Sequence, residues 1–505
     1  MIPSTFLPYF SPEISLAFWA MGLLLFEAFF DLSPRKVVFV AYACLLWAAI
    51  ITLLLDPTPT LFWGGTCKWD GAAKFFDLFF IAVTALVIWM GDEVQAPVKH
   101  GGGEFVILPL FTTVGLMLLA SANDFMLLFI ALELVTISFY ILVAYQRRNI
   151  IALEAGVKYL ILGGLSSAFL VMGIAYIFGI TGTTRFDLIW QWSQAHSGTM
   201  PAALGFGLLL VLAGVGFKIA MVPFHSWAPD VYEGAPNSIT AFLSVGSKAG
   251  GLIILMRLVL GLFDNAAAAA VWIPILSFGA IASLLLGNLA AIPQRNLKRL
   301  LGYSSIGHTG FILVAVIGAS VSLGGIAGHQ STGDANDGQV AVTAYLVSYF
   351  LATFTAFIVL AVLDRRLPGL EIHHLAGLSQ RSPLLAAAFA LSLVSLAGIP
   401  PMSGFIAKAL VVLVAWNRGL YTLLFFTIFA AVAALYYYLG PIKAMYWSQP
   451  LDETPIRLNR ITSGVLITLI VLLIVTGFWA QSIFVLINGA TVSANVAYPV
   501  VLIQH

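Results

Sequence analysis

Charged residues are scarce in this sequence. Only 9% of its 505 residues are Asp, Glu, Lys or Arg, whereas 61% are hydrophobic, and the mean hydropathy is +1.00. This composition excludes an ordinary soluble protein and predicts an all-α polytopic protein that lies in a lipid bilayer. The net charge is only +1, so nothing in the charge balance points to nucleic acid as a partner.

Cysteine is nearly absent as well. Cys44 and Cys67 are not spaced as metal ligands, and the sequence contains neither a G-x-G-x-x-G pattern nor a P-loop. These absences argue against a zinc, iron-sulfur or nucleotide site on this chain. Any redox chemistry that the protein serves is therefore expected on another polypeptide.

Long apolar segments are abundant. A helix needs about 20 mostly apolar residues to cross a bilayer, and we expect about 14 transmembrane helices. The first segment is not interpreted as a secretory signal, because its basic residues Arg35 and Lys36 follow it. The predicted segments lie near residues 13–31, 37–55, 74–91, 104–121, 124–145, 154–181, 203–236, 239–262, 271–292, 300–318, 340–363, 383–416, 419–447 and 461–487.

The basic residues predict an orientation for these segments. Cytoplasmic loops carry an excess of Lys and Arg. If the N-terminus lies outside, the inner connections hold far more basic residues than the outer ones, so both termini are expected on the periplasmic side. The inner set is Arg35, Lys36, Lys99, Arg147, Arg148, Arg295, Lys298, Arg299, Arg365, Arg366, Arg381, Lys443, Arg457 and Arg460, and the outer set is Lys68, Lys74, Arg185 and Arg418.

Five further basic residues fall inside the predicted segments. Lys158 and Arg257 lie near segment ends, where a long side chain can extend to the interface or act functionally, and both interpretations stay open. Lys218, Lys248 and Lys408 lie well inside their segments, between apolar or small residues.

Glu133 joins these three lysines as a candidate site residue. At a rise of 1.5 Å per residue, it lies about 14 Å into a hydrocarbon core about 30 Å thick. Ionisable groups at that depth are costly and usually functional, although a purely structural ion pair is the alternative.

Two segments, 203–236 and 383–416, are too long for one straight crossing. Pro223 with Pro229 is expected to interrupt the first, and Pro400 with Pro401 the second. These are the seventh and twelfth spans. Two five-helix units, spans 4–8 and 9–13, would therefore form inverted repeats with a broken helix at the same position in each.

This interpretation divides the chain into four parts. We expect three N-terminal transmembrane helices in residues 1–100 and the first five-helix repeat in 101–262. The second, inverted repeat would occupy residues 263–447, and the fourteenth helix would lie in 448–505.

Four motifs around these residues resemble a known family. They are KIAMVPFHSWAPDVYEGAP from Lys218, LELVTISFYIL at Glu133, GSKAGG at Lys248 and GIPPMSGFIAK ending at Lys408. Together they resemble the antiporter-like membrane subunits of respiratory complex I, the proton-translocating NADH:quinone oxidoreductase. The lysine at 408 and the absence of a long C-terminal lateral helix favour the N type.

The resemblance implies a proton relay. Glu133 would pair with Lys218 on the broken seventh span, Lys248 would lie centrally, and Lys408 would end the route. It also implies no cofactor on this chain, with NAD, FMN, iron-sulfur clusters and quinone held by partner subunits. The partners would be the other membrane subunits, through them the peripheral redox arm, and the lipid of a bacterial cell inner membrane.

Several polar residues have weaker cases. His308 in LLGYSSIGHTGF would continue a relay between Lys248 and Lys408, or only pack by hydrogen bonding. His225, beside the first break, would be a relay group or only a partner for freed backbone carbonyls. The run Tyr436 to Tyr438 is typical of an interfacial aromatic belt.

Two other functions stay open. The chain would otherwise be a subunit of a multi-subunit cation/proton antiporter of the same fold, or a structural spacer whose buried charges only hold helices together.

Overall fold

The computed structural model describes residues 11–30, 33–94, 103–196, 200–263, 265–320, 335–367, 369–450 and 452–479. Lys99, the end of the predicted segment 461–487 and both chain termini lie outside these ranges. Within them the chain is predominantly helical. A short antiparallel sheet of β1 (Thr60–Phe62) and β2 (Cys67–Trp69) connects the second and third helices.

Twelve helical segments of the described residues are long and apolar enough to cross a bilayer, which confirms a polytopic helical membrane protein. The element from α10 to η5 counts as one continuous segment. The twelve are α1 (Pro12–Phe29), α2 (Pro34–Leu54), α3 (Gly71–Trp89), α4 (Glu104–Ser121), α5 (Phe125–Val143), α6 (Ile150–Thr181), α10 to η5 (Asn237–Leu262), α12 (Ala266–Ala291), α13 (Leu297–Gly318), α15 (Ala335–Asp364), α19 (Tyr421–Trp447) and α20 (Arg460–Phe478).

The two segments expected to be interrupted are indeed divided. The first consists of α8 (Ala202–Lys218) and α9 (Trp227–Gly234), and the second of α17 (Pro383–Ala397) and α18 (Ser403–Asn417). Pro223, Pro400 and Pro401 lie in the gaps, as predicted. Pro229 does not, because it lies in the first turn of α9, where a missing backbone N–H breaks no helical hydrogen bond.

The eighth predicted segment changes its winding three times. It begins as α10 (Asn237–Phe242), passes through the π-helical turn η4 (Leu243–Ser247), returns to α-helix in α11 (Lys248–Met256) and ends in the π-helical η5 (Arg257–Leu262). Such π-helical turns are often found at functional sites. The shorter remaining elements are η2 (Trp63–Gly65), η3 (Met90–Val94), α7 (Phe186–Ala195), η6 (Ile372–Leu375) and α16 (Leu378–Arg381).

Asparagine and aspartate residues mark where many of these helices begin. Their side-chain oxygens accept hydrogen bonds from backbone N–H groups of the first turn, which have no partner within the helix. These N-cap residues are Asp70, Asp124, Asn149, Asn265, Asn296 and Asn459. The local sequence thus fixes the start of helices whose apolar runs alone would leave it undefined.

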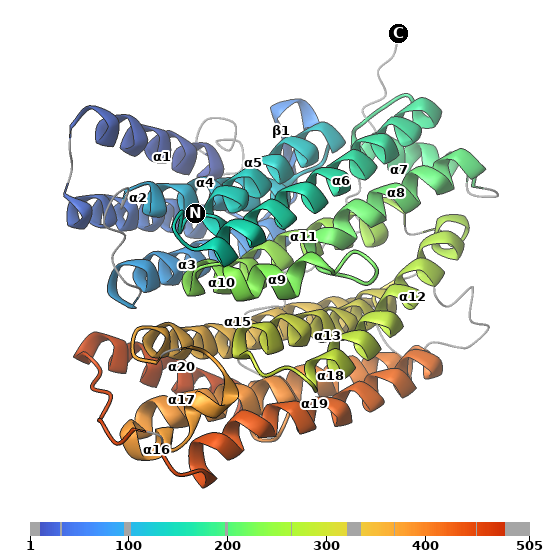
Figure 1. Ribbon diagram of the computed structural model, residues 1–505. Coiled ribbons are helices and arrows are strands. Elements are labelled where there is room, and N and C mark those ends of the chain that lie inside the picture. The colour runs from blue at the N-terminus through green and yellow to red at the C-terminus, as the bar shows by residue number, and fades with distance from the viewer. Residues whose placement is uncertain are drawn as a thin grey trace.

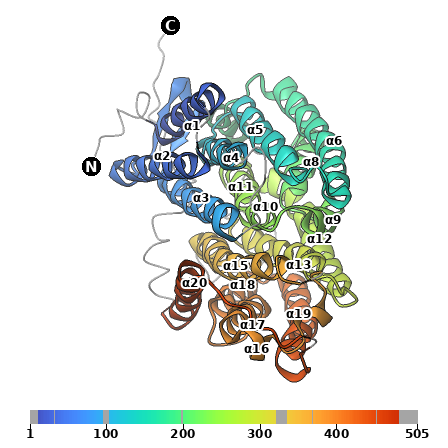
Figure 2. The same ribbon diagram turned by 60° about the vertical axis from the view of Figure 1, so that its left-hand side comes forward.

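The helices run side by side, with α1 to α11 in one half of the molecule and α12 to α20 in the other (Figure 1). The turned view places α11, α13 and α15 in the interior, and α1, α2, α6 and α20 at the margin (Figure 2). Burial agrees with this arrangement. In the most apolar window of the helix Asn237–Leu262 every residue is buried, against 22% in α20.

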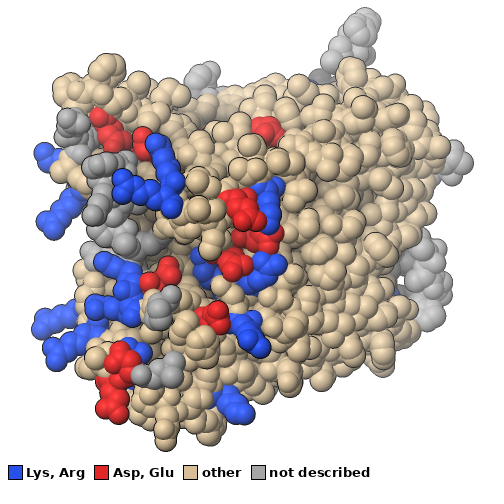
Figure 3. Space-filling view, in the orientation of Figure 1, with Lys and Arg blue, Asp and Glu red and all other residues tan. Residues whose placement is uncertain are grey.

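Charged side chains gather at one end of the helices. On the face shown in Figure 3, Lys and Arg collect mainly at the end where α1 meets α2, and the opposite end shows almost none. Exposed members of the predicted inner set include Arg35, Lys36, Arg147 and Arg148. Lys298 and Arg381 of the same set are buried instead.

Candidate functional site: a row of buried lysines

The three lysines predicted from the sequence lie on interior elements. Lys218 is the last residue of α8, Lys248 the first of α11, and Lys408 lies in the second turn of α18. Their exposed fractions are 5%, 2% and 7%. Three ammonium groups are therefore removed from both water and lipid, and each needs polar partners inside the protein.

Lys218 reaches α5. Its Nζ donates a hydrogen bond to Oγ1 of Thr136, three residues after Glu133 on the same helix. Glu133 is partly buried and accepts a hydrogen bond from the Ser167 hydroxyl on α6. The structure shows no ion pair between Lys218 and Glu133, and each of these two described residues has a hydroxyl partner.

The gap after α8 leaves backbone N–H and C=O groups without hydrogen-bond partners in a helix. Side chains from three helices are the partners instead. Non-helical backbone at membrane depth is tolerated only where such groups are satisfied. Trp227 Nε1 donates to Phe217 O at 2.9 Å, Thr309 Oγ1 to Ile219 O at 2.6 Å, and the Val222 N–H to Ser283 Oγ at 3.0 Å.

The absence of a side chain at Gly251 lets α11 lie directly against this break. A Cβ atom there would be 2.7 Å from Ile219 Cγ2 and 3.2 Å from Lys218 Cβ. Since Gly251 is one turn after Lys248, this close approach brings the second lysine to the broken span.

Lys248 faces the second half of the chain. Its Nζ donates to both the carbonyl oxygen and the hydroxyl of Ser305 on α13, each at 2.6 Å, and lies 5.0 Å from the centre of the Tyr349 ring on α15. The Ser305 hydroxyl also contacts the Tyr232 hydroxyl at 2.8 Å. A charged lysine is thus held by a carbonyl, a hydroxyl and an aromatic face.

His308 lies one turn beyond Ser305 and is buried. Its Nδ1 is 2.6 Å from the Tyr345 hydroxyl and its Nε2 is 3.1 Å from the Tyr438 hydroxyl, while its ring centre is 4.9 Å from that of Tyr349. Both ring nitrogens therefore have protonatable partners. His308 thus lies against Tyr349, the tyrosine beside Lys248.

Lys408 completes the row. Its Nζ donates to the carbonyl oxygen of Ala397, the last residue of α17, at 2.8 Å, and lies 4.8 Å from the Phe311 ring centre. A cavity of about 10 Å³ adjoins it, which is room for about one water molecule. The polar residues that line the cavity are His308, Tyr345, Ser348, Tyr349, Ser395 and Lys408.

The sequence interpretation of the three tyrosines was wrong in part. Tyr436 is 71% exposed and suits an aromatic belt, but Tyr437 and Tyr438 are buried. Successive residues of a helix point about 100° apart, so a run of three cannot all face the interface. Tyr438 instead joins His308 and also hydrogen-bonds the Ser304 hydroxyl.

His225 is not brought into the row. It is partly buried in the gap between α8 and α9, and among the described residues no hydrogen bond joins it to the lysines.

The hydroxyl partners of the row were not predicted as site residues from the sequence. Thr136, Ser167 and Tyr438 carry no sequence signal of their own, but Tyr345 and Tyr349 are four residues apart and so share one helix face.

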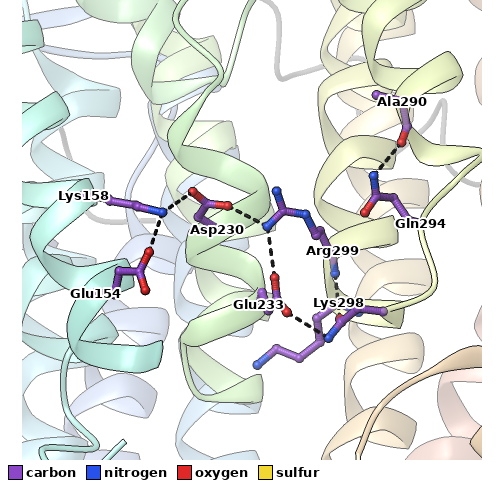
Figure 4. A network of polar contacts seen from close by, with 9 residues as sticks. Glu154, Lys158, Asp230, Glu233, Ala290, Gln294, Lys298 and Arg299 are labelled. Atoms are coloured by element: carbon purple, nitrogen blue, oxygen red, sulfur yellow. Dashed lines mark hydrogen bonds and ion pairs between the residues drawn. The ribbon is translucent and has the colours of Figure 1, made fainter. Parts of the chain in front are cut away.

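A second network of charges joins the broken span to its neighbours (Figure 4). Lys158 on α6 pairs with Glu154 at 2.7 Å and with Asp230 on α9 at 2.8 Å. Arg299 on α13 pairs with Asp230 at 2.6 Å and Glu233 at 3.0 Å. These ion pairs connect α9 to helices on either side of it, so Lys158 does more than reach the interface.

Arg257 does not extend to the interface either. It is 5% exposed, its guanidinium binds both carboxylate oxygens of Asp70 at 2.9 and 3.1 Å, and its Nε donates to Ala120 O at 2.7 Å. This buried bidentate pair ties η5 to the start of α3. No group of three or more His, Cys, Asp or Glu suited to a metal occurs among the residues described above.

Comparisons with known proteins show the family of this chain. Residues 122–434 match the family model described as NADH:quinone oxidoreductase/Mrp antiporter, TM. A relative from Rhodospirillum rubrum named NADH-quinone oxidoreductase subunit N is 37% identical, with 96% of each chain covered.

Two solved structures have a similar fold. A chain of respiratory complex I from Thermus thermophilus with bound aureothin aligns with a TM-score of 0.77 and 30% identity, over 93% of this chain and 97% of the other. A chain of the Mrp complex from Dietzia sp. aligns with a TM-score of 0.78 over 96% of this chain and 98% of the other, but at 19% identity it shows the fold alone. The chain therefore belongs to the NADH:quinone oxidoreductase/Mrp antiporter family, as an antiporter-like subunit of the N type.

Proposed function

We propose that this chain is the proton-translocating membrane subunit of an NADH:quinone oxidoreductase and that Glu133, Lys218, Lys248 and Lys408 carry the protons. The observation that supports this most is the row itself: three buried lysines on interior helices, with hydroxyl, imidazole and carbonyl partners between them. Ionisable groups at this depth mark proton pathways.

The gate of this relay is the region of Glu133 and Lys218. Desolvation disfavours the charged lysine, and a carboxylate that approaches it favours the charged form. At about 4 Å and an effective dielectric constant of about 20, such a pair is worth roughly 4 kcal/mol. Moving one charge against 100 mV costs about 2.3 kcal/mol, so closing and opening this pair has the magnitude of one pump step.

From Lys248 the route continues through the second half of the chain. His308 lies between the tyrosine that covers Lys248 and the cavity beside Lys408. Both its ring nitrogens face hydroxyl groups, so the imidazole can accept a proton on one side and release it on the other. His225 has no such place and is left out of the route.

The membrane topology that goes with this function is also a proposal. Counting each divided pair of helices as one crossing adds two to the twelve continuous spans and gives fourteen. We assign residues 1–100 to an N-terminal unit, 101–262 and 263–447 to two inverted five-helix repeats, and 448–505 to the last helix. Both termini would lie on the periplasmic side of a bacterial inner membrane, opposite the end rich in Lys and Arg.

Redox chemistry belongs elsewhere in the assembly under this proposal. NAD, FMN, iron-sulfur clusters and quinone would be held by partner subunits, and this chain would contact the neighbouring membrane subunits and, through them, the peripheral arm. The role of this chain is then translocase without a cofactor of its own.

The test is NADH-driven proton uptake in inverted membrane vesicles that carry Lys218→Ala, with assembly checked on native gels. We expect an assembled complex in which quinone reduction and pumping both collapse. The matched control is Lys443→Ala, an exposed lysine near the end of α19, which should pump at the wild-type rate. Pumping at the wild-type rate by Lys218→Ala, or by a variant in which Lys218 and Lys408 are both neutralised, would make the charges structural and the chain a spacer.

A cation/proton antiporter subunit is the second candidate, because the Dietzia Mrp complex has the same fold. The two functions differ in the cation that they transport and in whether they depend on NADH. A strict need for Na⁺ or K⁺ in transport, with no response to NADH, would favour the antiporter.

A further inference from the structure

An apolar groove opens between α1 and α2. Its volume is about 580 Å³, within the range of about 300–1,000 Å³ that is usual for small-molecule sites. Gly22 gives it depth, since a Cβ atom there would meet nothing within 4 Å. The lining residues used below are Phe18, Gly22, Phe26, Arg35, Lys36 and Phe39.

The walls of the groove are aromatic and open to the membrane. Phe18 is 73% exposed, Phe26 53% and Phe39 75%. Both helices are mostly uncovered by the rest of the chain, with 28% of the α1 window and 39% of the α2 window buried. The groove therefore faces the hydrocarbon of the bilayer rather than water.

One end of the groove is positively charged. Arg35 and Lys36 occupy the first turn of α2, are exposed, and form no ion pair with another described residue. They lie at the end of the molecule where basic side chains gather, which is where phosphate groups of lipids are found. Among the residues that the structure describes, the two cations thus have no counter-charge at headgroup depth.

Apolar walls with a cationic end match one class of molecule. A neutral lipid would fill the groove without using Arg35 and Lys36. A soluble anion would use the two cations but not the aromatic walls. An anionic phospholipid satisfies both, because its acyl chain is apolar and its phosphate carries the missing negative charge.

We propose that this groove is a binding site for one anionic phospholipid. An acyl chain would lie on Gly22 between the rings of Phe18 and Phe39, and the phosphate would contact Arg35 and Lys36. The bound lipid would hold α1 against α2. This inference does not depend on proton translocation, so the two can fail separately.

The experiment measures lipid bound to the detergent-purified complex by native mass spectrometry, as phosphatidylglycerol or phosphatidylcholine is titrated in. In the double variant Arg35→Gln with Lys36→Gln we expect phosphatidylglycerol to bind roughly 30-fold more weakly, since each basic residue near a lipid surface contributes about fivefold. Phosphatidylcholine, whose phosphate is balanced by its own choline cation, should lose much less affinity. Gly22→Leu, which fills the groove, should lower the binding of both lipids.

The control is Arg147→Gln with Arg148→Gln, an exposed basic pair that lies outside the groove and follows Tyr145, whose hydroxyl contacts Glu104 at the end of the molecule where α1 ends. This control variant should bind phosphatidylglycerol in the groove as tightly as the wild type. An equal loss in the control and in Arg35→Gln with Lys36→Gln would mean general attraction of anionic lipid and would overturn the proposal. A cross-link from Phe18→Cys to another subunit in the intact complex would overturn it too, because a protein would then occupy the groove.

Discussion

Lys408 and Ala397 meet across the interruption of a divided span, where the lysine Nζ donates to the alanine carbonyl oxygen at 2.8 Å. Ala397 ends α17, and a cation at the carboxyl end of a helix interacts favourably with the helix dipole. Lys218 is itself the last residue of α8. In both divided spans a lysine is therefore associated with the carboxyl end of the helix that precedes the break, Lys408 through its ammonium group and Lys218 as the last residue of that helix.

The position of His308 predicts a selective loss of proton transfer. His308→Gln keeps hydrogen-bonding capacity toward Tyr345 and Tyr438 but removes a group that can bind a proton. We expect assembly to persist and NADH-driven pumping to fall about tenfold or more. A positioned acid or base usually contributes about 10²–10⁴-fold, and the water that fits the cavity offsets part of the loss.

Tyr436→Phe is the matched control for this variant, since Tyr436 is exposed on the same helix as Tyr438. Its pumping rate should equal the wild-type rate. Unchanged pumping in His308→Gln would restrict His308 to packing.

The two buried acidic residues at the start of α3 and within it, Asp70 and Asp77, predict effects of different size on stability. Asp70→Asn would leave the Arg257 guanidinium buried without a counter-charge, which costs about 3–5 kcal/mol. Asp77 is also fully buried, but neither of its oxygens has a hydrogen-bond partner among the described residues. Asp77→Asn therefore breaks no pair and should cost less than about 1 kcal/mol.

Thermal unfolding of the detergent-purified complex compares these two variants. Asp70→Asn should lower the melting temperature clearly and Asp77→Asn should not. Equal effects would contradict the pairing of Asp70 with Arg257.

Gly404 predicts how closely the halves of the second divided span must pack. A Cβ atom there would lie 1.7 Å from the carbonyl oxygen of Ser395 on α17, a backbone atom that no rotamer change can move aside. Gly404→Ala should force α17 and α18 apart, which costs at least about 1–3 kcal/mol, and reduce the amount of assembled complex on native gels. Gly464→Ala, on α20 with nothing within 4 Å, should assemble normally. Normal assembly of Gly404→Ala would show that the two helices are not fixed in this contact.

We predict that the contacts anchoring the segment after α19 depend on pH. The hydroxyl and the backbone N–H of Thr454 donate to the Asp452 carboxylate, and Arg381 pairs with it at 3.2 Å. These contacts hold the pKa of Asp452 below its ordinary value. Because the folded state then binds this proton less readily than the unfolded segment, the anchoring is present at neutral pH. It is lost as the pH falls from about 3.9 through the lower folded value.

Hydrogen exchange of residues 452–459 at decreasing pH tests this sign. Protection should fall in the wild type through that window, and Asp452→Asn should show no such step. A wild-type loss of protection only at alkaline pH would contradict it.

Much of the architecture could be predicted because bilayer physics constrains the sequence strongly. The apolar segments, the two interruptions and the buried lysines all follow from the cost of polar groups in hydrocarbon. Pro229 was misjudged because the cost of proline depends on its place in a helix, and that place was not known. Pairings such as Asp70 with Arg257, 187 positions apart, depend on how helices pack and have no local signature.

The hydrogen-bond partners of the site residues could not be predicted from the sequence either. Lys218 and Glu133 were recognised as buried ionisable groups, but Thr136 and Ser167 were not, because hydroxyl residues are common in membrane helices and only packing selects those that face a charge. Tyr436 is exposed and Tyr438 is buried because of the way α19 is rotated about its axis. The hydropathy pattern of this helix has no strong apolar face and so does not define that rotation.

The hydroxyl of Thr309 lies near two alternative hydrogen-bond acceptors beside the row of lysines. Its hydroxyl carries one proton but has two carbonyl oxygens within reach, that of Ile219 at 2.6 Å and that of Ser305 at 3.2 Å. Ile219 follows Lys218 at the break, and Ser305 holds Lys248. Whenever Lys248 turns away from the Ser305 oxygen, that oxygen can compete for the Thr309 proton, and the break next to Lys218 loses a partner. A single shared hydroxyl thereby makes the surroundings of two lysines on different helices depend on each other.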